Sequence, residues 1–127
     1  MSTDAQIVDP VVLIRIPKAY RHGMSDIALY EATRGVWKIG PRRDKARYAL
    51  AVYGSVVQEA YEIDYWQPAC TTPYKTRKFD NVKASSRWEF VGRVAPASVR
   101  VRYVGRSVGC HFAPGAQNPI TYVHVPL

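Results

Sequence analysis

Short apolar runs separated by turn residues dominate the sequence. Residues 11–16 form an apolar run that a proline follows, which is typical of a buried strand. Residues 47–53 and 56–65 flank the dipeptide Gly54-Ser55, which is a signal for a two-residue turn between antiparallel strands. We therefore expect a long β-hairpin in the middle of the chain.

The second hairpin strand alternates between apolar and polar residues. Its apolar positions are Val57, Tyr61, Ile63 and Tyr65. Its polar positions are Gln58, Glu62 and Asp64. Alternation with period two is typical of a strand that is buried on one face only, so we expect the first set to pack inside the protein and the second set to face solvent.

The rest of the chain predicts helices and further strands. Ser25 is a good N-cap for a short helix, and Gly35 supplies the stop at its C-terminal end. Residues 87–94 and 120–125 predict two strands, whereas residues 96–104 fit either a strand or a short helix. These elements predict the α+β class, with a small, mainly antiparallel β-barrel and one to three short helices.

Residues 67–86 interrupt this pattern. They lose the apolar periodicity and contain many Pro, Thr, Lys, Arg and Ser residues. Loops of this length in a small domain are usually functional or disordered. At the other end of the chain, residues 1–9 predict a flexible N-terminus. With 127 residues and 47% hydrophobic content there is enough apolar mass for one core, so residues 1–127 are predicted to form a single domain.

Composition narrows the cellular setting. Uninterrupted apolar runs such as residues 11–14 are far shorter than the roughly 20 residues that a membrane helix needs. The N-terminus lacks the basic and apolar regions of a signal peptide, so we expect a cytoplasmic protein with no membrane partner. Cys70 and Cys110 have no neighbours at metal-ligand spacing. We expect two free thiols, no metal and no cofactor.

The net charge of +8 is unevenly distributed along the chain. Residues 34–47 hold six basic residues and one acidic residue, a net +5, and residues 75–106 hold nine basic and two acidic residues, a net +7. The segment between them, residues 48–74, carries −3. Two basic blocks of this kind suit the phosphate backbone of a nucleic acid, although a solvated basic face has the same composition.

Three tryptophans stand at the ends of predicted segments, beside the basic blocks. Trp88 shares a strand face with Phe90 and Val94, so we expect it in the core. Trp37 precedes the first basic block and Trp66 opens the long loop, so both are candidates for lining a site. Stacking of an unpaired base on an aromatic ring contributes about 1–3 kcal/mol, while Lys and Arg hold the phosphates. An aromatic pocket also suits an extruded or modified base.

The order of elements resembles the PUA-like pseudobarrel superfamily, in particular its EVE, YTH and ASCH-type domains. The likeness is carried by Gly35-Val-Trp-Lys-Ile-Gly40 and by Tyr48-Ala-Leu-Ala-Val-Tyr-Gly-Ser-Val-Val57. In YTH domains a tryptophan after the helix forms one wall of a base cage. The resemblance therefore implies that Trp37 is a cage wall and that the main chain at Lys38 and Ile39 bonds to the base edge. Trp66, by its position, is the second wall, and Tyr53 is assigned to the same pocket.

We predict from this pattern a domain that binds DNA or RNA and stacks an extruded or modified base beside a basic groove. The residues expected to contact phosphates are Arg42, Arg43, Lys45, Lys75, Arg77 and Lys78. One alternative is a small enzyme of the same fold that acts on a nucleoside or nucleic acid, with Glu62 and Asp64 as weak candidates for acid–base work. Another is a protein-interaction module whose long loop becomes ordered on a partner protein. The sequence does not define an oligomeric state.

Overall fold

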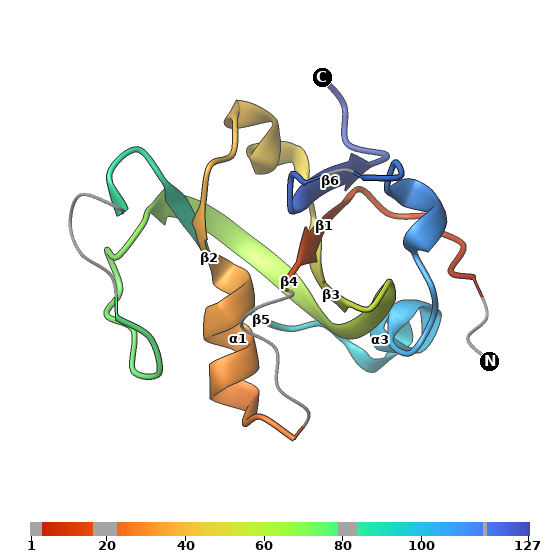
Figure 1. The fold of residues 1–127 in the computed structure, drawn as a ribbon, viewed down its shortest axis with the longest axis horizontal. Coiled ribbons are helices and arrows are strands. Elements are labelled where there is room, and N and C mark those ends of the chain that lie inside the picture. Colours follow the sequence, from red (N-terminus) through yellow and green to blue (C-terminus); the bar gives the residue numbers. More distant parts are fainter. Residues whose placement is uncertain (1–3, 17–22, 79–83, 116) are drawn as a thin grey trace.

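One curled sheet forms the framework of the protein. The computed structural model describes residues 4–16, 23–78, 84–115 and 117–127. Six strands lie in the order β2-β5-β4-β3-β1-β6 and bend into a half-barrel (Figure 1). The strands are β1 (Val11–Arg15), β2 (Gly35–Trp37), β3 (Tyr48–Tyr53), β4 (Val56–Pro68), β5 (Trp88–Val94) and β6 (Ile120–Val123).

Two α-helices and two 3-10 turns complete the described part of the chain. They are α1 (Asp26–Arg34), η1 (Pro41–Lys45), α3 (Ala97–Tyr103) and η2 (Gly109–His111). Strands β1 and β3 are parallel, and all other neighbouring strands are antiparallel. The prediction of a small α+β protein with a barrel-like, mainly antiparallel sheet is therefore confirmed.

Both faces of the sheet are buried. On one face Leu13, Leu50 and Val57 belong to a core cluster that includes Val99 and Tyr103 of α3. On the other face, residues such as Ile14 and Phe90 form a second cluster, against which Leu29 and Tyr30 of α1 pack. Burial on both sides explains why β1 and β3 are almost continuously apolar.

Helix α1 begins after Ser25 and ends before Gly35, as predicted, but the structural reason for the glycine differs from the predicted one. The Ser25 hydroxyl accepts a hydrogen bond from the N–H of Ala28 at 3.2 Å and so caps the helix. Gly35, which follows the helix, has an extended backbone and starts β2. A Cβ at this position would lie 2.8 Å from the Cβ of Glu89. Glycine is needed here because β2 and β5 approach each other closely.

The predicted single apolar face of the second hairpin strand is wrong: Val57 belongs to the first core cluster, whereas Tyr61 belongs to the second. The pairing register shifts between Ala51 and Val52 on β3 and between Ile63 and Tyr65 on β4. A bulge adds one residue to a strand and so exchanges the faces of the residues that follow it. As a result Tyr65 is 56% exposed and Trp66 is only 8% exposed.

Two other segments differ from expectation or settle an ambiguity. Residues 97–103 form a helix, so the strand alternative for this region is wrong. Residues 4–9, expected to be flexible, are anchored: Ala5 and Ile7 are buried, and the N–H of Ala5 donates to the carbonyl of Ser107 at 2.8 Å. Residues 1–3 lie outside the described part. In the described residues, no helix has the length and apolarity required to cross a membrane.

Candidate nucleic-acid interface

Strand β2 forms one edge of the sheet and leads from α1 to η1 (Figure 1). Trp37 on β2 lies directly opposite Trp88 on β5. Side chains of such a cross-strand pair lie on the same face, with their Cβ atoms about 5 Å apart. Both tryptophans are half-buried. Both side chains also pack against the second core cluster, so the edge of the sheet presents the partly exposed sides of two tryptophans.

The end of α1 fixes the ring of Trp37. Its indole N–H donates to the carbonyl of Thr33 at 2.7 Å. Carbonyls in the last turn of a helix lack partners within the helix, so the indole satisfies one of them. The ring is thus held in one orientation before any ligand arrives.

Three arginines from three different segments bind carbonyls in the stretch that carries Trp37. Arg77 donates to the carbonyl of Gly35, Arg87 to that of Val36 at 3.5 Å, and Arg43 to that of Ile39 at 3.2 Å. A guanidinium keeps its full charge when it makes such bonds. Three guanidinium groups therefore bind the main chain on either side of Trp37: Arg43 comes from the first predicted basic block, and Arg77 and Arg87 come from the second.

The first basic block, on η1, is strongly engaged within the protein. The guanidinium of Arg43 lies 3.6 Å from the centre of the Trp88 ring, and that of Arg42 lies 4.7 Å from the centre of the Tyr122 ring on β6. Arg42 also donates to the carbonyl of Val125 at 2.7 Å. The ammonium of Lys45 donates to the carbonyl oxygen of Leu127 at 2.6 Å. Turn η1 therefore connects β5, near one edge of the sheet, with β6 at the other edge.

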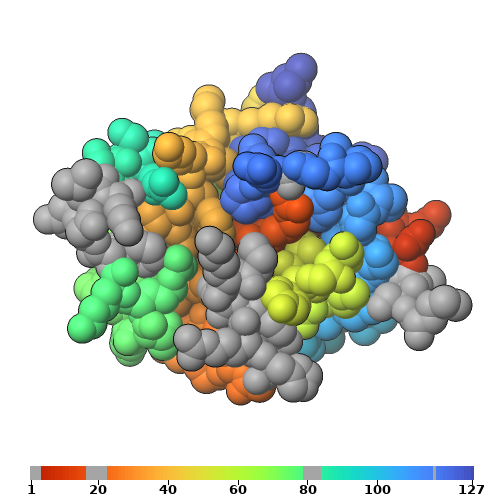
Figure 2. Space-filling model, viewed as in Figure 1, coloured from red at the N-terminus to blue at the C-terminus, as the bar shows by residue number. Residues whose placement is uncertain are grey.

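Residues 75–78, the start of the second basic block, lie on the loop of residues 69–78, which contacts the first residue of β2 through Arg77. Lys75 and Lys78 are exposed, whereas Arg77 is half-buried and donates to the carbonyl of Glu31 at 2.8 Å. Figure 2 shows η1 and this loop on one face of the molecule, with the chain that follows β2 between them. Both basic blocks thus approach Trp37, although the side chains of the first are largely occupied.

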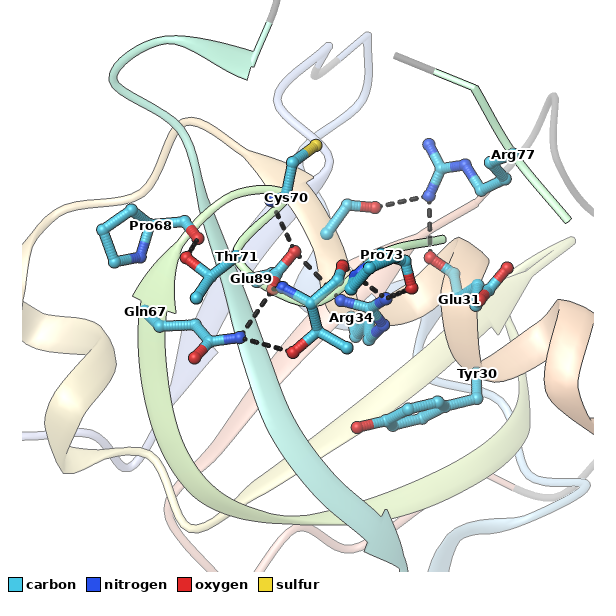
Figure 3. Close-up of polar contacts among 12 residues, drawn as sticks. Tyr30, Glu31, Arg34, Gln67, Pro68, Cys70, Thr71, Pro73, Arg77 and Glu89 are labelled. Atoms are coloured by element: carbon cyan, nitrogen blue, oxygen red, sulfur yellow. Dashed lines mark hydrogen bonds and ion pairs between the residues drawn. The ribbon is translucent and has the colours of Figure 1, made fainter. Parts of the chain in front are cut away.

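A buried ion pair anchors the start of this loop (Figure 3). Glu89 on β5 is fully buried and lies 2.9 Å from a guanidinium nitrogen of Arg34. Its carboxylate also accepts from the backbone N–H of Cys70 at 2.7 Å and of Thr72 at 3.0 Å, and from the side chain of Gln67 at 2.6 Å. These donors satisfy a charge that would otherwise be costly to bury.

A second buried carboxylate anchors the end of the loop. Glu31 on α1 accepts from the N–H of Lys75 at 2.8 Å, from the N–H of Thr76 at 2.7 Å and from the Thr76 hydroxyl. Burial raises the pKa of this carboxyl, but the Thr76 hydroxyl and the two backbone donors outweigh it and hold the pKa below its usual value. Neither carboxylate could be identified as a loop anchor from the sequence, because most of their partners lie far away along the chain.

A groove of about 440 Å³ lies beside Trp88. It is bounded by the chain on both sides of the loop, including Pro68, Cys70, Ser85, Ser86 and Arg87. Its size admits one nucleotide-sized group next to the exposed part of the tryptophan. Cys70 lines this groove. Partial burial, together with the charge of Glu89, raises the pKa of the Cys70 thiol.

The structure does not bring the predicted base pocket together as expected. Trp66 packs edge-on against Phe90, with ring centres 5.4 Å apart, and β5 separates its strand from β2. Tyr53 lies opposite Val56 at the hairpin turn, the end of β4 remote from Trp66. Trp88, expected in the core, is half-buried: it packs against the core cluster that contains Phe90 and also lies opposite Trp37. Lys38, which follows Trp37, is exposed and Ile39 is half-buried, and the carbonyl of Ile39 accepts from Arg43.

The two candidate catalytic carboxylates bind the same arginine. A guanidinium nitrogen of Arg93 lies 2.6 Å from Asp64, and another lies 3.7 Å from Glu62. These contacts join β4 to β5 across the bulge. In the part of the chain that the structure describes, no cluster of His, Cys, Asp or Glu has the geometry of a metal site, and both cysteines are free and exposed.

Comparisons of the chain with protein-family models, with curated proteins and with solved structures give no significant match. The resemblance to the PUA-like superfamily therefore stays a prediction, and the function is argued from the interface itself.

Proposed function

We propose that this protein binds nucleic acid and that an unstacked base lies against Trp37 and Trp88 at the edge of the sheet. The observation that carries the proposal is the position of Arg77 and Arg87 on the carbonyls of Gly35 and Val36, next to Trp37. Aromatic planes supply stacking for any base, and surrounding cations supply attraction to the phosphates.

The position of the charges favours a polyanion that extends across the edge of the sheet. The exposed Lys38 lies next to Trp37, and the exposed Lys75 and Lys78 lie beyond Arg77 on the loop. A ligand that spans these side chains must carry several negative charges on a flexible backbone. A single strand, or a duplex with an extruded base, meets this description.

The half-barrel and the place of Trp37 directly after α1 support the PUA-like fold as part of this proposal. The groove beside Trp88 supports recognition of a modified base, because it leaves room for an added group next to the stacked ring.

A titration of the protein with single-stranded oligonucleotides, and with duplexes that contain a modified base, tests the proposal. Each phosphate contact to a single strand contributes a slope of about −0.7 to the dependence of log K on log salt. Three contacts therefore predict a loss of roughly 20-fold in affinity between about 50 and 200 mM salt. Absence of binding at about 50 mM salt, or binding without salt dependence, would overturn the proposal.

Replacement of the stacking ring sharpens this test. We expect Trp37→Ala to weaken binding by about 5- to 150-fold, which corresponds to about 1–3 kcal/mol for one stacked base. Tyr65→Ala is the matched control, because this aromatic residue is also exposed but lies on β4, beyond β5. Equal losses for the two variants would argue against a base on Trp37.

A further inference from the structure

We infer that Glu31 is a positioning residue of this interface: its buried carboxylate fixes the end of the loop so that Arg77 lies beside Trp37 and the neighbouring lysines face the ligand. The inference rests on the proposed function and adds to it the part of the structure that prepares the basic side. Glu31 itself is 3% exposed and is not expected to touch the nucleic acid.

The contacts of Glu31 are concentrated on the two residues that precede Arg77. Both oxygens of its carboxylate are used, one by the N–H of Lys75 and the other by the N–H and hydroxyl of Thr76. The main-chain carbonyl of Glu31 accepts from the guanidinium of Arg77 at 2.8 Å. One residue of α1 therefore holds three consecutive residues of the loop.

The same helix end holds the stacking ring. The carbonyls of Glu31 and Gly35 bind Arg77, and the carbonyl of Thr33 binds the indole of Trp37. The position of the cation relative to the ring is thus set by one short segment, residues 31–37. A ligand then meets side chains that are already placed, and each side chain that need not be ordered on binding improves affinity by roughly 2- to 10-fold.

Glu31 is separable from the other loop anchor. Glu89 binds the loop at Cys70 and Thr72 and neutralises the buried Arg34, so its loss threatens the fold. Loss of the Glu31 contacts leaves that ion pair in place and frees only the part of the loop that carries the cations.

The test is Glu31→Gln, with affinity for a single-stranded oligonucleotide and its salt dependence as the first readout. Removal of a negative charge from a nucleic-acid-binding protein should by itself strengthen binding. The positioning role predicts the opposite sign: binding about 5- to 10-fold weaker, with a salt slope shallower by about 0.7 as the Arg77 contact is lost. Glu62→Gln, which makes the same change of charge on β4, should bind as well as the wild type or slightly better.

Amide hydrogen exchange of Lys75 and Thr76 is the second readout and needs no ligand. We expect both amides to exchange faster in Glu31→Gln, because the glutamine side chain brings an N–H group toward these donors. If Glu31→Gln does not fold, Thr76→Val carries the test, since it removes one hydrogen bond to Glu31 without any change of charge. We expect Thr76→Val to bind roughly 2-fold more weakly, because it loses one of the three bonds.

The outcomes separate the inference from the proposed function. Faster exchange with unchanged or tighter binding would show that the loop is released without effect on the ligand, and would overturn the positioning role alone. Wild-type exchange rates together with wild-type affinity in Glu31→Gln would also overturn it. Absence of salt-dependent binding by the wild-type protein would overturn the proposed function, whatever the exchange rates show.

Discussion

The two basic segments on either side of Trp37 have similar composition and opposite roles. On η1 the cations are used for packing: Arg43 stacks on Trp88, and Arg42 stacks on Tyr122. The loop of residues 69–78 is held instead by hydrogen bonds from its backbone N–H groups to two buried carboxylates outside the loop, those of Glu31 and Glu89.

This difference shows that a run of basic residues does not reveal what its charges do. Where aromatic rings and free carbonyls are available nearby, arginines become part of the structure, because a guanidinium can stack and donate at the same time. Where carboxylates accept hydrogen bonds from the backbone N–H groups of a loop, the lysine side chains of that loop remain exposed to solvent. We therefore expect changes on η1 to alter mainly stability, and changes at the exposed lysines of the loop to alter mainly binding.

The largest effect on the free energy of unfolding is expected when the buried ion pair between Glu89 and Arg34 is removed. Glu89→Gln leaves the charge of Arg34 buried without a counter-ion, which should lower the free energy of unfolding by about 3–5 kcal/mol. Urea unfolding measures this. For Glu62→Gln, whose partly exposed carboxylate lies 3.7 Å from Arg93, we expect a loss below about 1 kcal/mol. Similar losses in both variants would contradict the assignment of Glu89 as the anchor.

On η1, Arg43→Lys tests whether the guanidinium is structural. The lysine keeps the charge but loses the flat stack on Trp88 and the bond to Ile39, so we expect the free energy of unfolding to fall by about 2 kcal/mol. Arg47→Lys is the matched control, because Arg47 is exposed and its guanidinium lies 5.3 Å from the Tyr48 ring centre. A larger loss in the control would remove the contrast between the two segments.

The loop anchor at Glu31 should respond to acid. Hydrogen bonds hold the pKa of Glu31 below its unfolded value of 4.5, so the stabilisation it provides is complete above that pH and is lost as pH falls through the lower, folded value. We expect the difference in unfolding free energy between wild type and Glu31→Gln to be largest near neutral pH and to shrink in acid. A difference that does not change with pH would mean that the charge of Glu31 is not what holds the loop.

The smallest effect on stability is expected at an exposed lysine of the loop. Lys78→Ala removes an exposed cation, so the free energy of unfolding should change by less than about 0.5 kcal/mol. If Lys78 contacts a phosphate, the salt slope for a single strand becomes shallower by about 0.7. A stable variant with an unchanged slope would place Lys78 outside the interface.

Much of the fold follows from local signals. The hairpin turn at Gly54-Ser55 and the Ser25 cap lie within a few residues of the atoms they organise, and both are present. The bulge between Ile63 and Tyr65 has no such signal. It exchanged the places of Tyr65 and Trp66 and moved the predicted second wall into the core.

The site was harder to predict because its contacts join distant parts of the chain. Trp37 was identified by its place after the helix, but its neighbour Trp88 is set by the pairing of β2 with β5. Glu31 and its loop partners are 44 and 45 residues apart, so neither charge nor periodicity connects them.

The arginines that surround Trp37 also protect the sheet from other chains. Strand β2 is an edge, and an edge strand with unused carbonyls can pair with a strand of another molecule and start aggregation. Here the carbonyls of Gly35 and Val36 are occupied by Arg77 and Arg87. An invading strand would have to displace both side chains, so the groups that attract a ligand also keep the edge closed to self-association.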